Sequence, residues 1–221
     1  MEKLNRLLLF APAFVLGLSL HEAAHAWAAD KLGDPTAKNQ GRLTVDPMAH
    51  LDPIGTLVFV FSAMAGIGFG WAKPVPVTLQ YLRRPLRDWA LIAVAGPVSN
   101  VVQFLCWYIV LVIFILFARS FPASLDPLRN VMIGICVGGV LVNATLAVFN
   151  LLPIPPLDGS RILRAFLPAE GVLWMDRLEM SNFGFILLMG LMYVGVLGWI
   201  LAPVLEVIWR MLRPLGLDVG L

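Results

Sequence analysis

Residues 6–29, RLLLFAPAFVLGLSLHEAAHAWAA, form an apolar run that carries His21, Glu22 and His25 near its end. A helix that crosses a hydrocarbon core of about 30 Å needs roughly 20 mostly apolar residues, so this run is long enough to span. The N-terminus carries two positive residues, Lys3 and Arg6, before the apolar residues, as in a signal peptide, but a convincing small-residue cleavage site is missing. We therefore predict that the run is a retained first span.

The composition of the 221-residue chain supports a membrane protein. It is 59% hydrophobic with a mean hydropathy of +0.84, whereas soluble domains are roughly 45–50% apolar. Only 14% of the residues are charged, and they separate long apolar runs rather than alternate with them, as loops separate spans. We expect a single integral-membrane domain over 1–221, embedded in a lipid bilayer.

The charge balance argues against a nucleic-acid partner. The net charge is only +2, and the Lys and Arg residues are scattered along the chain. A surface that neutralises many phosphates requires a concentrated basic patch. We therefore expect no nucleic acid among the partners.

Further apolar runs of sufficient length lie at about 88–118, 129–152 and 182–209. We expect the last to be a span followed, after Pro203, by an interfacial helix, because proline removes a backbone donor and two arginines follow. The C-terminal span and this helix together would cover about 182–213. The expected fold is all-α and polytopic, with about four to five transmembrane helices.

A fifth apolar run, about 54–70, is shorter and contains four glycines. His21 and His25 lie near the end of the first span, and Asp158 follows the end of the 129–152 span. If these side chains share one depth, the two spans run in the same direction and an odd number of crossings separates them. The 88–118 helix supplies one crossing, so we predict that 54–70 is re-entrant or interfacial, buried in protein where irregular backbone is tolerated.

The distribution of basic residues predicts the orientation, because cytoplasmic loops carry an excess of Lys and Arg. With the His21 end inside, the cytoplasmic segments hold ten basic residues, against six outside. The ten are Lys31, Lys38, Arg42, Lys73, Arg83, Arg84, Arg87, Arg161, Arg164 and Arg177. We expect a multi-pass protein of a prokaryotic plasma membrane with its site facing the cytoplasm.

The sequence His21-Glu22-Ala23-Ala24-His25 is an HExxH motif on a predicted helix. A spacing of four residues places both imidazoles on one face, where they can bind a single zinc ion. Glu22 would lie close enough to take a proton from water activated by the metal. The alternative is a polar cluster that only holds helices together, but ionisable groups in a membrane helix are costly without a function.

A catalytic zinc commonly has three protein ligands and one open position. The candidate for the third ligand is Asp158, which follows three prolines in NLLPIPPLDG, residues 150–159. The prolines end the preceding helix and favour an extended approach to the carboxylate. On spacing alone, Asp158 could equally be a turn residue or the N-cap of a helix around 160–166.

Together, HEAAH at 21–25 and NLLPIPPLDG at 150–159 resemble the two signature motifs of the site-2 protease family of intramembrane zinc metalloproteases. AGPVSN at 95–100 resembles a segment of the family's central helix, and the likeness covers about 5–165, the expected protease core. The resemblance implies one zinc per chain, held by His21, His25 and Asp158, and an endopeptidase that cleaves transmembrane proteins or peptides. It also implies that Glu22 is the general base and acid.

Two asparagines have further expected roles. By the resemblance, Asn150 helps to hold the substrate or the developing oxyanion, to which its amide could donate; an interhelical hydrogen bond is the alternative. For Asn100, helix packing as a polar clamp and contact with substrate are equally open.

Two segments, 41–52 and 71–77, could form short β-strands beside the active site. An exposed edge there could pair with an unwound substrate by strand addition, and plain surface loops are the alternative. His50 lies in the first segment, and we leave it out of the ligand set because a lone loop histidine is usually structural.

A membrane metal-ion transporter is the competing function, since His and Asp in membrane helices also form transit sites. Transport requires no general base beside two imidazoles, and the sequence does not show the two related halves of a repeat-based transporter. Glu22 therefore favours the protease.

Overall fold

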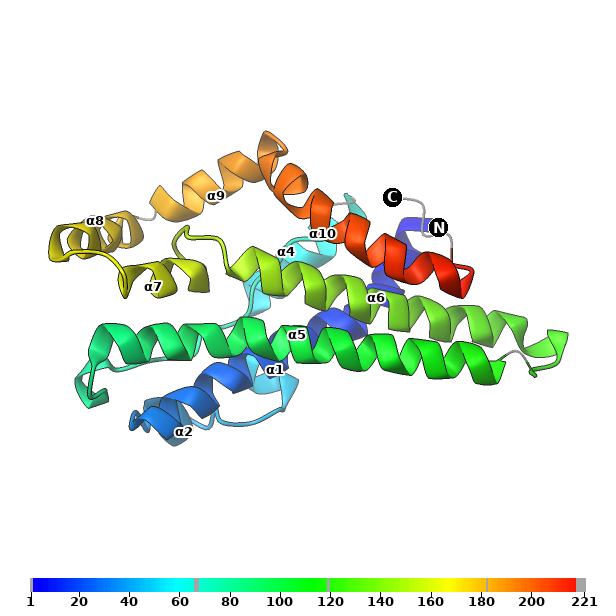
Figure 1. Cartoon of the computed structure of the whole chain (residues 1–221), viewed down its shortest axis with the longest axis horizontal. Helices are drawn as coiled ribbons and strands as arrows, with labels where there is room; N and C mark the ends of the chain where they lie inside the picture. The colour runs from blue at the N-terminus through cyan, green and yellow to red at the C-terminus, as the bar shows by residue number, and fades with distance from the viewer. Residues whose placement is uncertain (1, 66–67, 119, 182, 218–221) are drawn as a thin grey trace.

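Three long helices form the centre of the molecule (Figure 1). The computed structural model describes residues 2–65, 68–118, 120–181 and 183–217. The long helices are α1 (Glu2–Leu32), α5 (Pro85–Ala118) and α6 (Asp126–Asn150), and each packs against the other two. All three are long and apolar enough to cross a membrane, as predicted.

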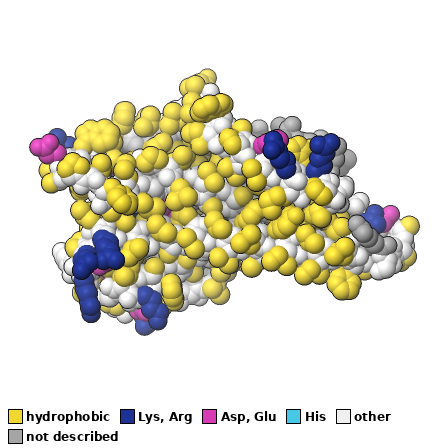
Figure 2. Space-filling view, viewed as in Figure 1, with side chains coloured by type: hydrophobic (Ala, Val, Ile, Leu, Met, Phe, Trp, Pro, Cys, Tyr) yellow, Lys and Arg dark blue, Asp and Glu magenta, His cyan; other side chains and the backbone are white. Residues whose placement is uncertain are grey.

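The outer surface of these helices is apolar. Figure 2 shows hydrophobic side chains over most of the visible face, with charged groups gathered in a few patches toward its ends. Along α5, the exposed side chains include Val98, Val101, Val102, Leu105 and Ile109. Such a continuous apolar surface is unfavourable in water and is suited to lipid.

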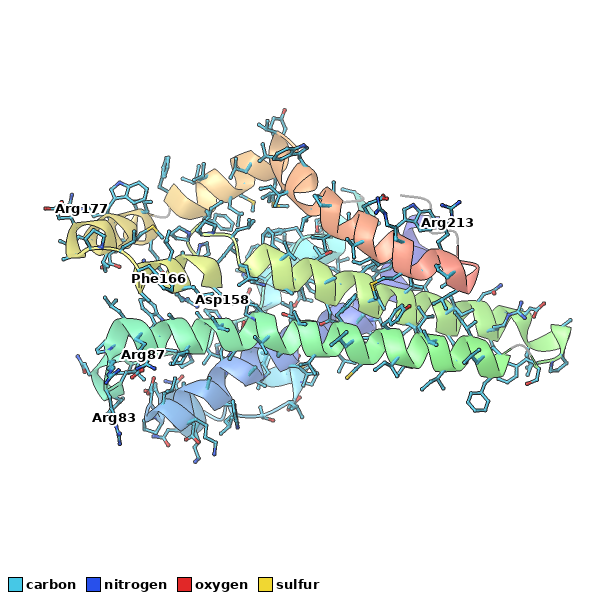
Figure 3. The ribbon with its side chains drawn as sticks, viewed as in Figure 1. Arg83, Arg87, Asp158, Phe166, Arg177 and Arg213 are labelled. Carbon is cyan, nitrogen blue, oxygen red and sulfur yellow. The ribbon has the colours of Figure 1, made fainter. Side chains whose placement is uncertain are left out.

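Basic side chains lie toward both ends of the molecule (Figure 2). Arg83 and Arg87, at the start of α5, lie at the same end as Arg177, and Arg213 lies toward the other (Figure 3). Arg177 belongs to α8 (Ala169–Met180), which follows the short α7 (Asp158–Arg164). Asp158, at the start of α7, lies nearer the end that carries Arg83 and Arg87 (Figure 3).

The C-terminal apolar run forms a bent pair of helices. α9 (Phe183–Tyr193) and α10 (Val196–Leu212) meet at 67°. The expected break after Pro203 is wrong, because Pro203 lies within α10, and the bend is at Gly195, whose φ of +83° suits glycine. If the pair counts as one span, the described chain has four candidate spans, and otherwise three.

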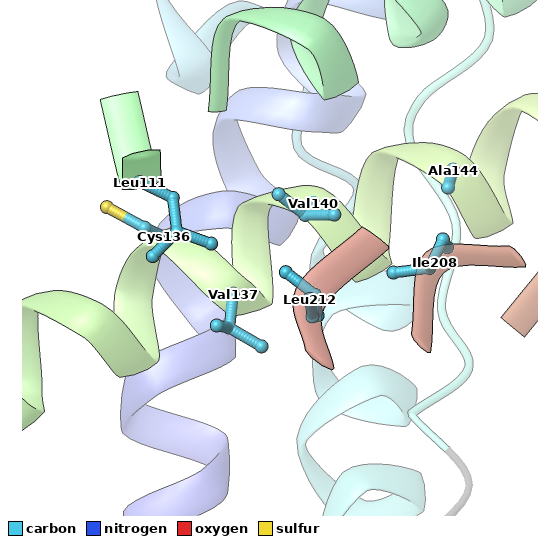
Figure 4. Packing of buried hydrophobic residues seen from close by; sticks show 7 residues of the cluster. All are labelled: Leu111, Cys136, Val137, Val140, Ala144, Ile208 and Leu212. Atoms are coloured by element: carbon cyan, nitrogen blue, oxygen red, sulfur yellow. The ribbon is translucent and has the colours of Figure 1, made fainter. Parts of the chain in front are cut away.

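Packing explains why α10 continues past its proline. Ile208 and Leu212 are buried against α6, where they join Leu111 and Val140 in one apolar cluster (Figure 4). An internal proline removes one backbone hydrogen bond. The burial of these side chains on the following turns offsets that loss.

The fifth apolar run forms α4 (Pro53–Met64), followed by a return of the chain. Twelve helical residues extend about 18 Å, too short to cross alone. A Cβ on Gly55 would lie 2.2 Å from the Trp71 carbonyl oxygen, and one on Gly70 would lie 2.6 Å from the Phe59 Cβ. Glycines thus let the returning segment lie directly against α4. That 54–70 does not cross the membrane stays a prediction.

No β-strand occurs among the described residues, so the expected strands are not shown. A single antiparallel bridge pairs Leu51 with Ala72. The 41–52 segment instead contains α3 (Pro47–His50), because the Asp46 side chain accepts from the Met48 N–H and Pro47 suits the first helical turn. The other short elements are α2 (Thr36–Asn39) and the 3₁₀ turns Leu79–Tyr81, Ala123–Leu125 and Arg213–Leu215.

Candidate metal centre and active site

The two histidines of the HExxH motif point their Nε2 atoms at one spot. Both lie on α1, both are buried, and their Nε2 atoms are 3.0 Å apart. Their rings are perpendicular, with centroids 4.6 Å apart. The helical spacing predicted this shared face.

Asp158 reaches the same spot from another helix, α7. Its Oδ2 lies 3.1 Å from the Nε2 of His21 and 3.2 Å from that of His25. Asp158 is the first residue of α7, where Leu157 occupies the N-cap position without a side-chain cap. The structure therefore brings together the three side chains predicted as ligands, and the N-cap alternative for Asp158 is wrong.

Close backbone packing after α6 makes this approach possible. A Cβ on Gly159 would lie 2.2 Å from the Leu151 carbonyl oxygen, so the chain turns back tightly onto the end of α6. On α5, a Cβ on Gly96 would lie 2.5 Å from atoms of both imidazoles. Glycine at 96 thus leaves the space that His21 and His25 occupy.

The second nitrogen of each imidazole is bound to an oxygen acceptor. The Nδ1 of His21 is 2.6 Å from the Asn100 Oδ1, and the Nδ1 of His25 is 2.7 Å from the Ile92 carbonyl oxygen. Because a carbonyl oxygen can only accept, each Nδ1 carries the proton and donates it. Each Nε2 therefore presents a lone pair to the centre, the arrangement that metal-ligating histidines require.

Asn100 belongs to a hydrogen-bonded chain between the three long helices. Its Nδ2 donates to the Gly17 carbonyl at 3.2 Å and to the Asn143 Oδ1 at 2.9 Å. The Asn143 Nδ2 in turn donates to the Gly139 carbonyl at 2.9 Å. Asn100 is thus a clamp that orients His21, the first of the two roles considered for it. Asn143 was not predicted from the sequence, although an amide within an apolar run is itself a signal; its side chain is fully buried.

The three converging atoms fit a metal ion. With both Nδ1 atoms protonated, no hydrogen lies between the Nε2 atoms and the Asp158 Oδ2, and this Oδ2 is buried without a hydrogen-bond partner. Three electron-pair donors this close repel one another unless a cation joins them. Donors held tetrahedrally by zinc lie about 3.3 Å apart, close to the distances of 3.0, 3.1 and 3.2 Å observed.

The carboxylate of Asp158 is divided between two partners. Its Oδ1 accepts from the Arg161 Nη1 at 3.3 Å, while its Oδ2 faces the imidazoles. The Arg161 guanidinium also lies over the Trp89 ring, 5.6 Å from its centroid. Arg161 was expected only as a cytoplasmic charge.

Glu22 lies beside the imidazoles. A carboxylate oxygen of Glu22 and one ring nitrogen from each of His21 and His25 all lie within 4.8 Å of one another. Its Oε2 accepts the backbone N–H of Val75 at 3.0 Å. This position suits a group that exchanges protons with water at the centre, as predicted for a general base.

These groups line a cavity of about 470 Å³. Most of the other lining residues are apolar, with Glu179 an exception. Among them, the ring pairs Phe69–Trp71, Phe69–Phe149 and Trp71–Phe185 have centroids 6.1 to 6.3 Å apart. Asn150 also lines the cavity, and its Nδ2 donates to the Leu146 carbonyl of its own helix at 3.0 Å. The interhelical hydrogen bond considered for Asn150 is not found among the described residues, and its oxyanion role stays a prediction.

His50 takes no part in this cluster. Its ring is almost fully buried, and its Nε2 donates to the Thr44 carbonyl at 2.8 Å. The histidine therefore holds its own loop together, which agrees with leaving it out of the ligand set.

The family follows from comparison with known proteins. The model of "Peptidase family M50" matches residues 9–191, which include His21, His25 and Asp158. The chain belongs to peptidase family M50. This confirms the resemblance to the site-2 proteases.

Several relatives of this M50 chain carry related names. "Putative zinc metalloprotease YwhC" of Bacillus subtilis is 36% identical over 196 residues, which are 87% of this chain and 83% of that protein. "Putative zinc metalloprotease Rip2" of Mycolicibacterium smegmatis is 33% identical over 74% of this chain and 59% of its own length. "Putative zinc metalloprotease MJ0611" of Methanocaldococcus jannaschii is 38% identical over 67% of this chain and 65% of its own length. No solved structure was found to match.

Proposed function

We propose that this chain is an intramembrane zinc metalloprotease that hydrolyses peptide bonds of membrane-spanning substrates. The observation that carries the proposal is the convergence of two imidazole nitrogens and one carboxylate oxygen beside the Glu22 carboxylate. Membership of a peptidase family and the zinc metalloprotease names of the relatives support it.

His21, His25 and Asp158 would hold one zinc ion, which acts as a Lewis acid toward water and the peptide carbonyl. Asn100 and the Ile92 carbonyl hold the imidazoles in the required tautomer. Glu22 would take the proton of the attacking water and deliver it to the leaving amine. The Asn150 amide, at the cavity wall, has a second N–H with which it could donate to the carbonyl oxygen as negative charge develops.

The apolar setting points to a substrate within the membrane. Helices α1, α5 and α6, which are long and apolar enough to span, form part of the cavity wall. The 69–77 segment, α7 and α9 form most of the rest, and the wall is largely aromatic and aliphatic. A peptide carbonyl that reaches the centre has to leave its helical hydrogen bond, which costs several kcal/mol in lipid. The substrate would therefore unwind locally before it is cut.

The orientation we propose places the metal centre toward the cytoplasm of a prokaryotic plasma membrane. Asp158 lies nearer the end of the molecule that carries Arg83, Arg87 and Arg177 (Figure 3). Cytoplasmic segments of membrane proteins are the ones enriched in Lys and Arg.

A metal-ion transporter is not favoured by this site. Glu22 is buried beside the imidazoles, with a carboxylate oxygen within 4.8 Å of their nitrogens. Transit of a metal has no use for such a proton acceptor, whereas hydrolysis requires one.

The direct test compares cells that carry the active protein with cells that carry Glu22→Gln. Fragments of membrane proteins are labelled and compared between the two. Fragments present only with the active protein support a protease and identify its substrates. Identical fragment patterns, with both proteins folded and zinc-loaded, would contradict the proposed function.

A further inference from the structure

The 71–77 segment, WAKPVPV, runs along the cavity that holds the metal centre. Trp71, Ala72, Pro74, Val75 and Val77 all line this cavity. The segment has no regular secondary structure apart from the bridge at Ala72. Its backbone groups must therefore find partners elsewhere.

Val75 is the only residue of 74–76 that can donate a backbone hydrogen bond, because proline lacks an N–H. That single N–H donates to the Oε2 of Glu22 at 3.0 Å. A carboxylate oxygen held by a fixed backbone donor no longer rotates freely. The other oxygen of Glu22 is then left to exchange the proton.

Arg42 holds the two carbonyls that come directly before Val75. Its Nη2 donates to the Lys73 carbonyl at 2.5 Å and its Nη1 to the Pro74 carbonyl at 3.3 Å. Only 5% of Arg42 is exposed, and no salt bridge to it is found in the described part of the chain. Burying a cation without an ion pair is energetically costly. This cost suggests that Arg42 has a function in this position.

The charge of Arg42 is nevertheless retained. Burial lowers the pKa of its guanidinium and the nearby Glu22 carboxylate raises it, with a net lowering. The ordinary pKa of an arginine guanidinium is so high that the group stays protonated despite this lowering. Arg42 therefore remains a donor to both carbonyls.

Further contacts fix the two ends of the segment. The Lys73 N–H donates to the His50 carbonyl at 2.8 Å, and the Thr78 N–H donates to the Asp34 Oδ2 at 2.7 Å. The Arg42 backbone is itself anchored, since its N–H donates to the Ala37 carbonyl at 2.8 Å. The direction of the Val75 N–H is thus set from several sides.

We propose that Arg42 and the Pro74-Val75-Pro76 segment form a device that positions the general base Glu22. Arg42 is a positioning residue: its guanidinium donates to the Lys73 and Pro74 carbonyls, and it acts on Glu22 through the Val75 N–H. This inference rests on the proposed function. It assigns the 71–77 segment a task distinct from strand addition, in which the Val75 N–H would be free for a substrate.

The test uses the full-length enzyme with zinc and a substrate obtained from the fragment comparison. We expect Arg42→Gln to lower kcat by roughly tenfold or more, a part of what general-base catalysis contributes. KM and zinc content should stay as in the unmodified enzyme, because the ligands do not contact Arg42. Arg42→Lys, which keeps a charged donor without the fork, should lie in between. Arg83→Gln is the control, since Arg83 is exposed and outside the site.

Val75 supplies a second, independent variant. Val75→Pro removes the N–H that donates to Glu22. Val75→Ala keeps this N–H, so its loss of kcat measures the effect of the shorter side chain alone. We expect Val75→Pro to lose much more kcat than Val75→Ala. If both changes act through Glu22, the Arg42→Gln/Val75→Pro double variant should be no slower than Val75→Pro alone. If they cause unrelated structural damage, the losses in kcat of the two single variants should multiply in the double variant.

The outcomes separate this inference from the proposed function. If the unmodified enzyme cleaves and Glu22→Gln does not, the function stands. A normal kcat for Arg42→Gln in that same assay would overturn the positioning role alone. Multiplied losses of kcat in the double variant, or losses matched by loss of zinc, would overturn it as well.

Discussion

The Nδ1 of His21 on α1 donates to the Oδ1 of Asn100 on α5 across 2.6 Å. This hydrogen bond fixes both the tautomer and the rotation of the imidazole, so that the Nε2 lone pair faces His25 and Asp158. Asn100 can act in this way because its own amide is held by Gly17 and Asn143. The metal centre therefore depends on contacts between all three long helices.

Asn100→Ala should weaken zinc binding by about 10- to 100-fold, the usual effect of removing an outer partner of a ligating histidine. Competition with a chelator of known affinity measures it. Val98→Ala, on the exposed face of the same helix, is the matched control. An unchanged affinity in Asn100→Ala would show that the hydrogen bond does not matter to the metal.

The purified protein should contain about one zinc ion per chain, and the simultaneous change of His21 and His25 to Ala should abolish it. Asp158→Ala should weaken zinc retention, whereas Glu22→Gln should keep the metal and lose cleavage. Elemental analysis and a cleavage assay give both readouts. Full zinc in the double histidine variant would rule out these ligands.

Arg161→Gln should reduce zinc affinity by roughly tenfold. This loss should be smaller than the loss in Asp158→Ala. The change removes the donor to the Oδ1 of Asp158 and leaves the ligating Oδ2 in place. Chelator competition on both variants compares them. Arg177→Gln, exposed on the neighbouring helix, serves as the control, and equal affinity in Arg161→Gln and this control would contradict the role.

Single cysteines placed at Lys38 and Arg84 should react from the same side of the membrane. The reason is that α4, between them, extends only about 18 Å and cannot cross alone. The cysteines are introduced into a protein in which Cys106 and Cys136 have been replaced. Labelling with an impermeant thiol reagent in intact cells and in inverted vesicles then shows on which side of the membrane each cysteine lies. Labelling of the two positions from opposite sides would mean that 54–70 crosses.

A transmembrane substrate with Gly or Pro near its cytoplasmic end should be cut faster than a matched Leu-rich one. These residues weaken a helix by about 1 and 3 kcal/mol relative to Ala, which lowers the cost of exposing the scissile carbonyl. Single-turnover rates on the pair test the idea. Equal rates would show that unwinding does not limit cleavage.

Local patterns in the sequence were enough to predict the long helices and the inner ligands. Runs of about 20 apolar residues define α1, α5 and α6, and a spacing of four places His21 and His25 on one face. Asp158 needed the family resemblance, because its spacing alone fits a turn equally well. The break at Gly195 was missed, since Pro203 was the stronger local signal and packing of Ile208 and Leu212 overrode it.

The sequence by itself determined that the chain spans a membrane and carries an HExxH helix, because hydropathy and helical periodicity depend on neighbours along the chain. Only the tertiary structure decided which groups surround that motif. Arg42 lies about 20 residues after Glu22, Val75 lies 53 residues after it, and Asn143 and Arg161 lie more than 100 residues after it. Nothing in their local sequence shows that they reach this motif. Their positions follow from how the helices pack and how the 71–77 segment returns against α4, and these are long-range contacts that no local spacing encodes.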